Sequence, residues 1–298
     1  MFVYQNVFKN NDEIRAFVQS AEDNYKNQVL HIANDIINEN QHIKFLTLSG
    51  PSCSGKTTSS YILENEFEKR GLTVKIISID DFYRDRQEIA DDEKPDYESI
   101  AAIDFPIFEH CVNQILEKKT VMLPKFDFKS GAKSEWTPYT PCENEIIIFE
   151  GIQAIYPEIV ATLPKSVAKS IHICVDEDVC AYGTVFEKRE IRFYRRLVRD
   201  FLFRNATPSR TLELWDGVVA NENVNIIPYS KNADYVINSF LPYELNVIKP
   251  FLLHTISYDQ TKENERMLLA HIRNEFGNIP QISSRFIPKD SVFREFIG

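Results

Sequence analysis

Apolar residues recur along the chain in two patterns, which predict helices and strands in alternation. In residues 12–38 the apolar side chains are spaced by three and four positions, the period of an amphipathic helix. Short continuous apolar runs are typical of strands buried on both faces. Runs of this kind occur at 43–50, 73–79, 145–151, 170–175 and 234–239.

The segments between these runs have the length and periodicity of helices. Residues 56–70 predict a helix that stops at Gly71, and further helical patterns cover 105–118, 186–204 and 261–276. Strands that alternate with helices favour a parallel sheet, because a crossover helix lets successive strands run in the same direction. We therefore expect an α/β protein with a mostly parallel sheet and helices on both of its faces.

Bulk composition narrows the classes of partner. The 298 residues are 43% hydrophobic, enough for a sizeable core, and the net charge of −10 argues against a wide nucleic-acid surface. No apolar stretch approaches the roughly 18 residues of a membrane span, and the five cysteines include no C-x-x-C pair. We expect a soluble, cytoplasmic protein with a small-molecule partner and no nucleic-acid or membrane partner. The sequence is compatible with a homo-oligomer.

The most specific motif follows the first buried strand directly. Residues 50–57 match G-x-x-x-x-G-K-[ST] at every fixed position, between a predicted strand and a predicted helix. In that context the backbone N–H groups and the helix N-terminus face the phosphates of a nucleotide. Lys56 is expected to bridge the β- and γ-phosphates, and Thr57 to offer its hydroxyl to Mg²⁺. The predicted nucleotide-binding residues here are Gly50, Pro51, Ser52, Cys53, Ser54, Gly55, Lys56, Thr57 and Thr58.

Acidic residues stand at the ends of two predicted strands. Asp80 and Asp81 follow the run 73–79, and Glu150 lies at the end of the run 145–151. Ligands of open α/β sheets bind at the carboxyl ends of the strands, where a carboxylate can orient an acceptor hydroxyl and take its proton. We interpret Asp80 as this base, with Asp81 as the alternative. Glu150 is interpreted as a group that holds Mg²⁺ directly or through water.

Basic residues concentrate in one predicted helix of this acidic protein. Four arginines share one face of it by their spacing of three and four: Arg192, Arg195, Arg196 and Arg199. A solvated face is the usual explanation for such a run, but the four charges repel one another, and a bound triphosphate would relieve that repulsion. We therefore predict an arginine-rich lid that closes over ATP. Arg192 and Arg195 would bind the nucleotide, and Arg196 and Arg199 would assist catalysis.

Taken together, these motifs resemble those of the uridine kinase and phosphoribulokinase family of P-loop kinases. Five strings occur in family order between about residues 43 and 250: GPSCSGKTT, SIDDFY, LPKFDF, IIIFEGIQA and RRLVRD. The closing IPKDSVFREFIG also resembles the kinase part of longer bacterial uridine-kinase-like proteins. The resemblance implies a three-layer P-loop NTPase fold, ATP and Mg²⁺ as cofactors, and transfer of phosphate to a hydroxyl group.

The resemblance also implies roles on the acceptor side. Asp80 falls at the position of the family's catalytic aspartate, and Tyr83 where an aromatic residue lines the acceptor site. Glu98 falls where an acidic residue holds ribose hydroxyls. Phe126 and Asp127 fall on the substrate-side motif P-x-Y-D-F. Asp81 completes the predicted substrate-binding set.

Two positions depart from the family pattern. Gly131 stands where uridine kinases of the family place a histidine that reads the pyrimidine ring, and Phe126 replaces the tyrosine of the motif. We favour a nucleoside of the uridine or cytidine type, phosphorylated on its 5′-hydroxyl. A phosphoribulokinase-like acceptor and a non-catalytic ATP-binding regulator remain as alternatives. A GTPase is disfavoured because the guanine-selecting N-K-x-D is absent.

The predicted domain organisation follows from these assignments. Residues 1–42 would form a helical appendage packed on the core, residues 43–250 the kinase domain, and residues 251–298 a C-terminal extension packed on the core. Within the kinase domain, 84–144 is expected to hold substrate-side insertions, and 186–219 the lid.

Overall fold

The computed structural model describes residues 1–39, 43–88, 97, 99–257 and 263–298, and it is built around a five-stranded parallel sheet. Each predicted apolar run supplies one strand of this sheet. The strands are β2 (Phe45–Ser49), β3 (Thr73–Ser78), β6 (Glu145–Glu150), β7 (Ala168–Cys174) and β10 (Tyr235–Asn238). The predicted sheet is therefore confirmed.

The strand order is β10-β7-β2-β6-β3, with β2 in the centre. From β2 the chain crosses to the edge strand β3 and returns to β6, and it then continues on the other side of β2 with β7 and β10. The direction of the crossovers changes at β2. In open α/β sheets, ligands bind beside the carboxyl end of the strand where this change occurs. The topology therefore places the loop after β2 at the expected ligand site.

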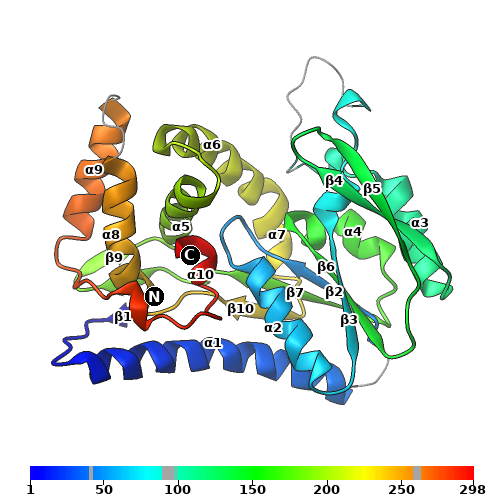
Figure 1. Cartoon of the computed structure of the whole chain (residues 1–298), viewed down its shortest axis with the longest axis horizontal. Helices are drawn as coiled ribbons and strands as arrows, with labels where there is room; N and C mark the ends of the chain where they lie inside the picture. The colour runs from blue at the N-terminus through cyan, green and yellow to red at the C-terminus, as the bar shows by residue number, and fades with distance from the viewer. Residues whose placement is uncertain (40–42, 89–96, 98, 258–262) are drawn as a thin grey trace.

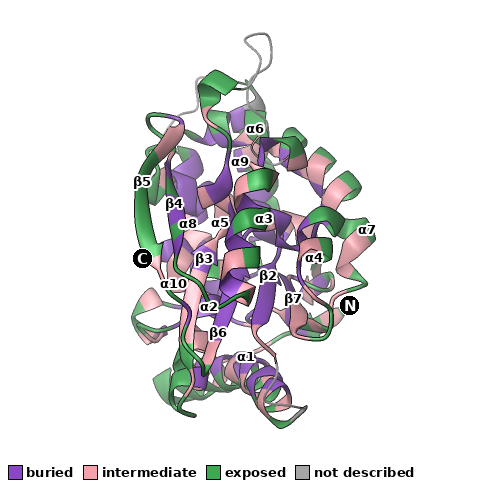
Figure 2. Ribbon diagram, turned by 90° about the vertical axis from the view of Figure 1, so that its right-hand side faces the viewer, coloured by how far each residue is buried: buried purple, intermediate pink, exposed green. Residues whose placement is uncertain are grey.

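Helices cover both faces of the sheet, which gives three layers (Figure 1). On one face, Leu46 of β2 lies in an apolar cluster with Val29 of α1 (Asn11–Glu39) and Leu63 of α2 (Lys56–Glu68). On the other face, Phe45 lies in a cluster with Phe108 of α3 (Phe105–Leu116). The short elements η4 (Ile152–Ile155) and α4 (Pro157–Thr162) also lie on this second face. Because both faces are covered, β2 and the inner part of β6 are buried (Figure 2).

Two smaller sheets flank the central one. β4 (Val121–Asp127) and β5 (Ala132–Tyr139) form an antiparallel hairpin that lies beside α3 (Figure 1). β1 (Phe2–Tyr4) pairs in parallel with β8 (Val179–Ala181), which pairs with β9 (Thr184–Phe186). These sheets were not predicted, although 84–144 was expected to hold insertions.

The second half of the chain is mostly helical. It contains α5 (Lys188–Phe203), α6 (Pro208–Asn221), a π-helical turn (Glu222–Ile226), α7 (Ile227–Ser230), α8 (Glu244–Ser257), α9 (Glu263–Glu275) and α10 (Arg294–Ile297). α5 packs against α6, α8 and α10. The predicted boundary at residue 250 falls inside α8, which runs across it without a break. Within the described part of the chain, no helix has both the length and the apolarity that a bilayer crossing requires.

Candidate active site

The loop between β2 and α2 is held in a tight turn by its glycines. A Cβ atom on Gly50 would lie 2.2 Å from the carbonyl oxygen of Ile173, so no larger residue fits there. Gly55, the N-cap of α2, has a φ of 92°, a left-handed conformation that glycine adopts without steric cost. A Cβ atom there would also meet Val292 at 2.6 Å. The loop thus joins a strand to a helix N-terminus, as the motif requires.

Side chains of α5 bind two backbone carbonyls of this loop. Arg192 Nη1 donates to the carbonyl oxygen of Ser52 at 3.1 Å, and Arg195 Nη1 donates to that of Cys53, also at 3.1 Å. The C=O and N–H of a trans peptide group point in opposite directions. Carbonyls bonded to α5 therefore turn the amides of the same peptide groups away from α5. These two contacts fix the backbone of the loop, and loops of this kind bind phosphate through backbone N–H groups.

Arg192 and Arg195 are also paired with buried carboxylates. Two nitrogens of Arg192 donate to Glu222, each at 2.6 Å, and Arg195 donates to Glu244 at 3.2 and 2.5 Å. These two glutamates neutralise the positive charges that a bound triphosphate was expected to neutralise. That argument does not hold for Arg192 and Arg195, whose contact with nucleotide stays a prediction. A closing motion of 186–219 also stays a prediction.

A cavity of about 500 Å³, here called the phosphate cavity, opens between the loop and α5. It is lined by Ser52, Cys53, Ser54, Gly55, Lys56, Thr57, Asp80, Phe128, Glu150, Gly151, Ile152, Arg196, Arg199, Arg204 and Glu295. The three arginines of the lining surround one carboxylate, Asp200, at 3.3, 2.7 and 3.7 Å. Three guanidinium groups share one anion, and Lys56 adds a further positive charge. These positive groups suit a polyphosphate, whereas the carboxylates of the same lining, Asp80, Glu150 and Glu295, suit a cation bound with it.

The two aspartates after β3 have separate environments. Asp80 lines the cavity and accepts a hydrogen bond from the Tyr83 hydroxyl at 3.0 Å. Burial raises the pKa of Asp80, while this hydrogen bond and the charge of Lys56 oppose the rise. Asp81 instead accepts from the backbone N–H of Phe126 at 3.2 Å and pairs with Lys125, so it fastens β4 to the core. Of the two, the structure brings Asp80 to the cavity.

Glu150 lies at the end of β6, in the same cavity as Thr57. Burial raises the pKa of Glu150 to about 7. The positive charge of Lys56 opposes this rise, whereas the neighbouring carboxylates Asp80 and Glu295 increase it. A carboxyl group this poorly compensated favours a nearby cation, and a carboxylate beside a hydroxyl is a donor set that suits Mg²⁺. Glu150 and Thr57 therefore fit the predicted magnesium site.

The raised pKa of Glu150 predicts a pH-dependent stability in the absence of metal. Below the ordinary value of 4.5 the group is protonated in the folded and unfolded states, and above about 7 it is ionised in both. The free energy of unfolding should therefore fall as pH rises between these values. Glu150→Gln removes this loss. Between pH 5 and pH 8 the free energy of unfolding of the wild type should therefore fall by about 1–3 kcal/mol more than that of the variant. Urea denaturation at both pH values measures the difference.

A matched control is Glu158→Gln, which changes an exposed glutamate on α4. Its unfolding curves should follow those of the wild type at both pH values. If the free energy of unfolding of the wild type and of Glu150→Gln changed equally with pH, the pKa of Glu150 would not be raised, and the prediction would be wrong.

An aromatic cluster borders the cavity through one of its members, Phe128. The rings of Tyr83, Tyr97, Phe126 and Phe128 lie with centroids 5.0–6.0 Å apart, and Phe128 reaches the cavity. The Gln153 amide donates to the Tyr83 hydroxyl at 2.9 Å and to the Tyr97 carbonyl at 2.5 Å. Among the described residues, the Gln153 Oε1 and the Tyr97 hydroxyl are buried without a hydrogen-bond partner. Buried polar atoms of this kind are candidates for contact with a ligand.

Other predicted acceptor residues lie elsewhere. Asp127 accepts from the backbone N–H groups of Lys129 and Ser130 at 2.9 and 3.2 Å, which lowers its pKa and closes the β4–β5 turn. Gly131 has a φ of 69°, and a Cβ atom there would lie 2.9 Å from the Arg86 side chain. This glycine is required by the turn. Glu98 lies outside the described residues.

Five residues that the site description uses were not predicted: Tyr97, Phe128, Gln153, Arg204 and Glu295. Gln153 follows the apolar run of β6 in the string IIIFEGIQA, so its place after the strand was a usable signal. Glu295 comes from α10, which lies beside the loop in Figure 1, and accepts a hydrogen bond from Thr58 at 3.0 Å. Thr58 and Glu295 are separated by 237 positions, and no local sequence pattern connects them.

Comparison with known proteins agrees with this geometry. A model of the phosphoribulokinase / uridine kinase family matches residues 45–244. The chain is 30% identical to a uridine kinase of Lactobacillus helveticus (strain DPC 4571) over 193 residues, which are 64% of this chain and 83% of that protein. It is 25% identical to uridine-cytidine kinase B of Dictyostelium discoideum over 213 residues, 70% of this chain and 79% of that protein.

A solved structure supports the fold. The YGR205w protein superposes with a TM-score of 0.52 at 17% identity, over 71% of this chain and 92% of its own. The family match extends from β2 to the start of α8 and includes the loop, Asp80, Glu150 and the arginines of α5. The chain therefore belongs to the phosphoribulokinase / uridine kinase family.

Proposed function

We propose that the protein transfers the γ-phosphate of ATP, with Mg²⁺, to the 5′-hydroxyl of a nucleoside of the uridine or cytidine type. Family membership makes it a P-loop kinase. The observation that carries the proposal is that Lys56 and Asp80 line one cavity, with Phe128 of the aromatic cluster at its side. A phosphate-binding loop, a candidate base and an acceptor surface thus meet at one place.

The positive groups of the cavity would hold the triphosphate and stabilise charge in the transition state. Lys56 would contact the β- and γ-phosphates, together with Arg196 and Arg199 of α5 and Arg204, which caps the C-terminus of that helix. In phosphoryl transfer the protein contributes mainly positioning and electrostatic stabilisation. Glu150 and Thr57 would hold Mg²⁺, which supplies charge neutralisation at the phosphates when bound.

Asp80 would orient the acceptor hydroxyl and receive its proton. As the acceptor oxygen bonds to the γ-phosphorus, the bond from that phosphorus to the bridging oxygen breaks, and ADP leaves. The hydroxyl proton passes to a carboxylate oxygen of Asp80. Tyr83 donates to Asp80 and accepts from Gln153, so the base is fixed in orientation from the acceptor side.

The aromatic cluster would bind the nucleoside. Flat rings suit a nucleobase, and the unpartnered Tyr97 hydroxyl and Gln153 Oε1 could each make one hydrogen bond to it or to its ribose. Such bonds would compensate polar atoms that are otherwise buried alone.

The proposal is tested by ADP release with Mg-ATP and a panel of acceptors: uridine, cytidine, adenosine, ribulose 5-phosphate and pantothenate. We expect turnover that depends on a pyrimidine nucleoside. Tyr97→Phe should raise the KM for that nucleoside about two- to tenfold, the effect of losing one neutral hydrogen bond. The control Tyr61→Phe changes an exposed hydroxyl on α2 and should leave the KM unchanged.

Turnover with ribulose 5-phosphate alone would support the phosphoribulokinase-like alternative. Tight ATP binding without turnover on any acceptor would support a non-catalytic regulator and contradict the proposal.

A further inference from the structure

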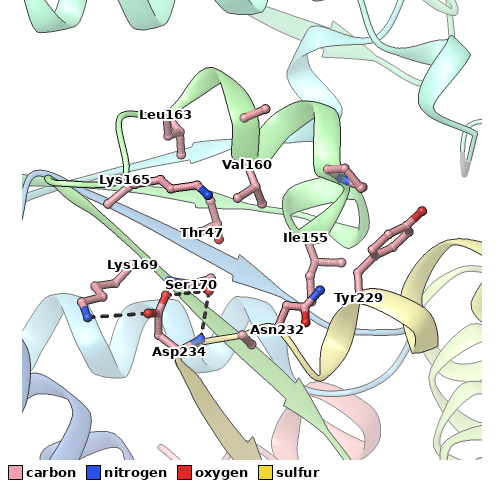
Figure 3. A pocket seen from close by; sticks show the side chains of 14 residues that line it. Thr47, Ile155, Val160, Leu163, Lys165, Lys169, Ser170, Tyr229, Asn232 and Asp234 are labelled. Carbon is pink, nitrogen blue, oxygen red and sulfur yellow. Dashed lines mark hydrogen bonds and ion pairs between the residues drawn. The ribbon is translucent and has the colours of Figure 1, made fainter.

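A second cavity of about 530 Å³ lies on the face of the sheet that carries α3 and α4. Its floor includes Thr47 of β2 and Ser170 of β7, and its walls include Val160 of α4 and Tyr229 of α7 (Figure 3). These two helices have only six and four residues, so they leave part of the sheet uncovered. Cavities of roughly 300–1,000 Å³ are the size of small-molecule sites in proteins.

One buried polar atom in this cavity has no partner. Thr47 is 2% exposed, and its hydroxyl makes no hydrogen bond within the described part of the chain. Leaving a buried hydroxyl unpaired costs about 1–3 kcal/mol, so such an atom in a cavity wall points to a ligand that pairs with it.

The charged groups around Thr47 differ in how far they are compensated. Asp234 accepts from the backbone and hydroxyl of Ser170, both at 2.8 Å, and pairs with Lys169 at 3.6 Å. Lys165 is an exposed residue that also lines the cavity, and it forms no ion pair with any described residue. The cavity therefore offers one uncompensated ammonium and one unpartnered hydroxyl, beside a wall of Ile155, Val160 and Leu163.

We propose that this cavity is a regulatory site for a small aryl carboxylate. The apolar wall and the Tyr229 ring suit a flat apolar body. A single ammonium matches the single charge of a carboxylate, whereas a phosphate dianion would bring a second, unmatched negative charge into a cavity that Asp234 also lines. The Thr47 hydroxyl would donate to the second carboxylate oxygen.

One short element connects this cavity to the active site. η4 presents Ile155 to the new cavity and Ile152 to the phosphate cavity, and between them Gln153 bonds to Tyr83 and Tyr97. The loop residues Ser52 and Cys53 are instead held by α5. A ligand against Ile155 should therefore change the KM for the acceptor more than the KM for ATP. This regulatory part rests on the proposed function, but binding does not.

Binding is measured by calorimetry on the full chain, with 2-naphthoate as the probe and saturating Mg-ADP present to occupy the phosphate cavity. We expect saturable binding with one site per chain and no comparable binding of the uncharged 2-naphthamide. Lys165→Met should weaken it at least about tenfold, the effect of losing a charge-assisted hydrogen bond, and Thr47→Val about two- to tenfold.

Two further variants locate the site. Val160→Phe should fill the cavity and abolish binding, with an unchanged circular dichroism spectrum as the check on folding. Lys119→Met changes an exposed lysine before β4 and should bind as the wild type does.

Absence of binding at millimolar 2-naphthoate, or binding that survives both Lys165→Met and Val160→Phe, would overturn the site. Binding that leaves the acceptor KM unchanged in an active enzyme would overturn its regulatory role. An inactive enzyme that still binds the probe would contradict the proposed function and leave the site standing.

Discussion

Asp80→Asn is expected to lower kcat about 100-fold or more, because asparagine cannot take the proton of the acceptor hydroxyl. Asp80 lines the phosphate cavity near Lys56, and its oxygen accepts from Tyr83 at 3.0 Å. The substitution preserves the shape of the side chain, so the KM for ATP should change little. Steady-state assays of ADP release at saturating acceptor measure the loss.

The matched control is Asp81→Asn, at the adjacent position. Asp81 fastens β4 through Phe126 and Lys125, so this variant should lose thermal stability and keep most of its kcat. A normal rate in Asp80→Asn together with a large loss in Asp81→Asn would move the base to Asp81.

Lys56→Met is expected to have an equal or larger effect, about 10²- to 10³-fold or more in kcat, since it removes a positive charge from the position of the transferred phosphate. The same lysine lowers the pKa values of both Asp80 and Glu150. Its loss should therefore raise both pKa values and shift the residual activity toward higher pH. The pH dependence of kcat in the variant measures this shift.

Lys44→Met is a suitable comparison for Lys56→Met. Lys44 precedes β2, at the opposite end of this strand from the loop, and donates to the carbonyl oxygen of Ile115 at 3.2 Å. The Lys44→Met variant should be less stable than the wild type, and the pH dependence of its kcat should be unchanged. A Lys56→Met enzyme with wild-type turnover would show that the loop does not bind the phosphates that react.

The central sheet could be predicted because its signals are local. Each strand is a continuous apolar run bounded by turn residues, and the loop after β2 has a motif with fixed spacing. The β4–β5 hairpin was missed because its second strand, AKSEWTPY, is mostly exposed, so it carries no apolar run. Each strand of the hairpin also contains one proline, Pro124 or Pro138, which argues against a strand. In a two-stranded hairpin both strands are edge strands, and edge strands tolerate proline.

The candidate site could be predicted only in part, because several of its contacts join distant segments. The arginines of α5 were recognised from their spacing, but Glu222 and Glu244 lie 30 and 49 positions from their partners. Without them, the four charges suggested a need for an external anion. Asp127 was assigned by its motif, whereas its carboxylate is engaged by the turn that follows it.

The buried pair of Arg195 and Glu244 also has an evolutionary consequence. Both side chains are 1% exposed, and the arginine additionally holds the loop carbonyl of Cys53. A glutamate left there without its partner would destabilise the fold by about 3–5 kcal/mol, whereas exchanging both residues for apolar ones can be neutral. Related sequences should therefore gain or lose this arginine and this glutamate together, as one inherited unit.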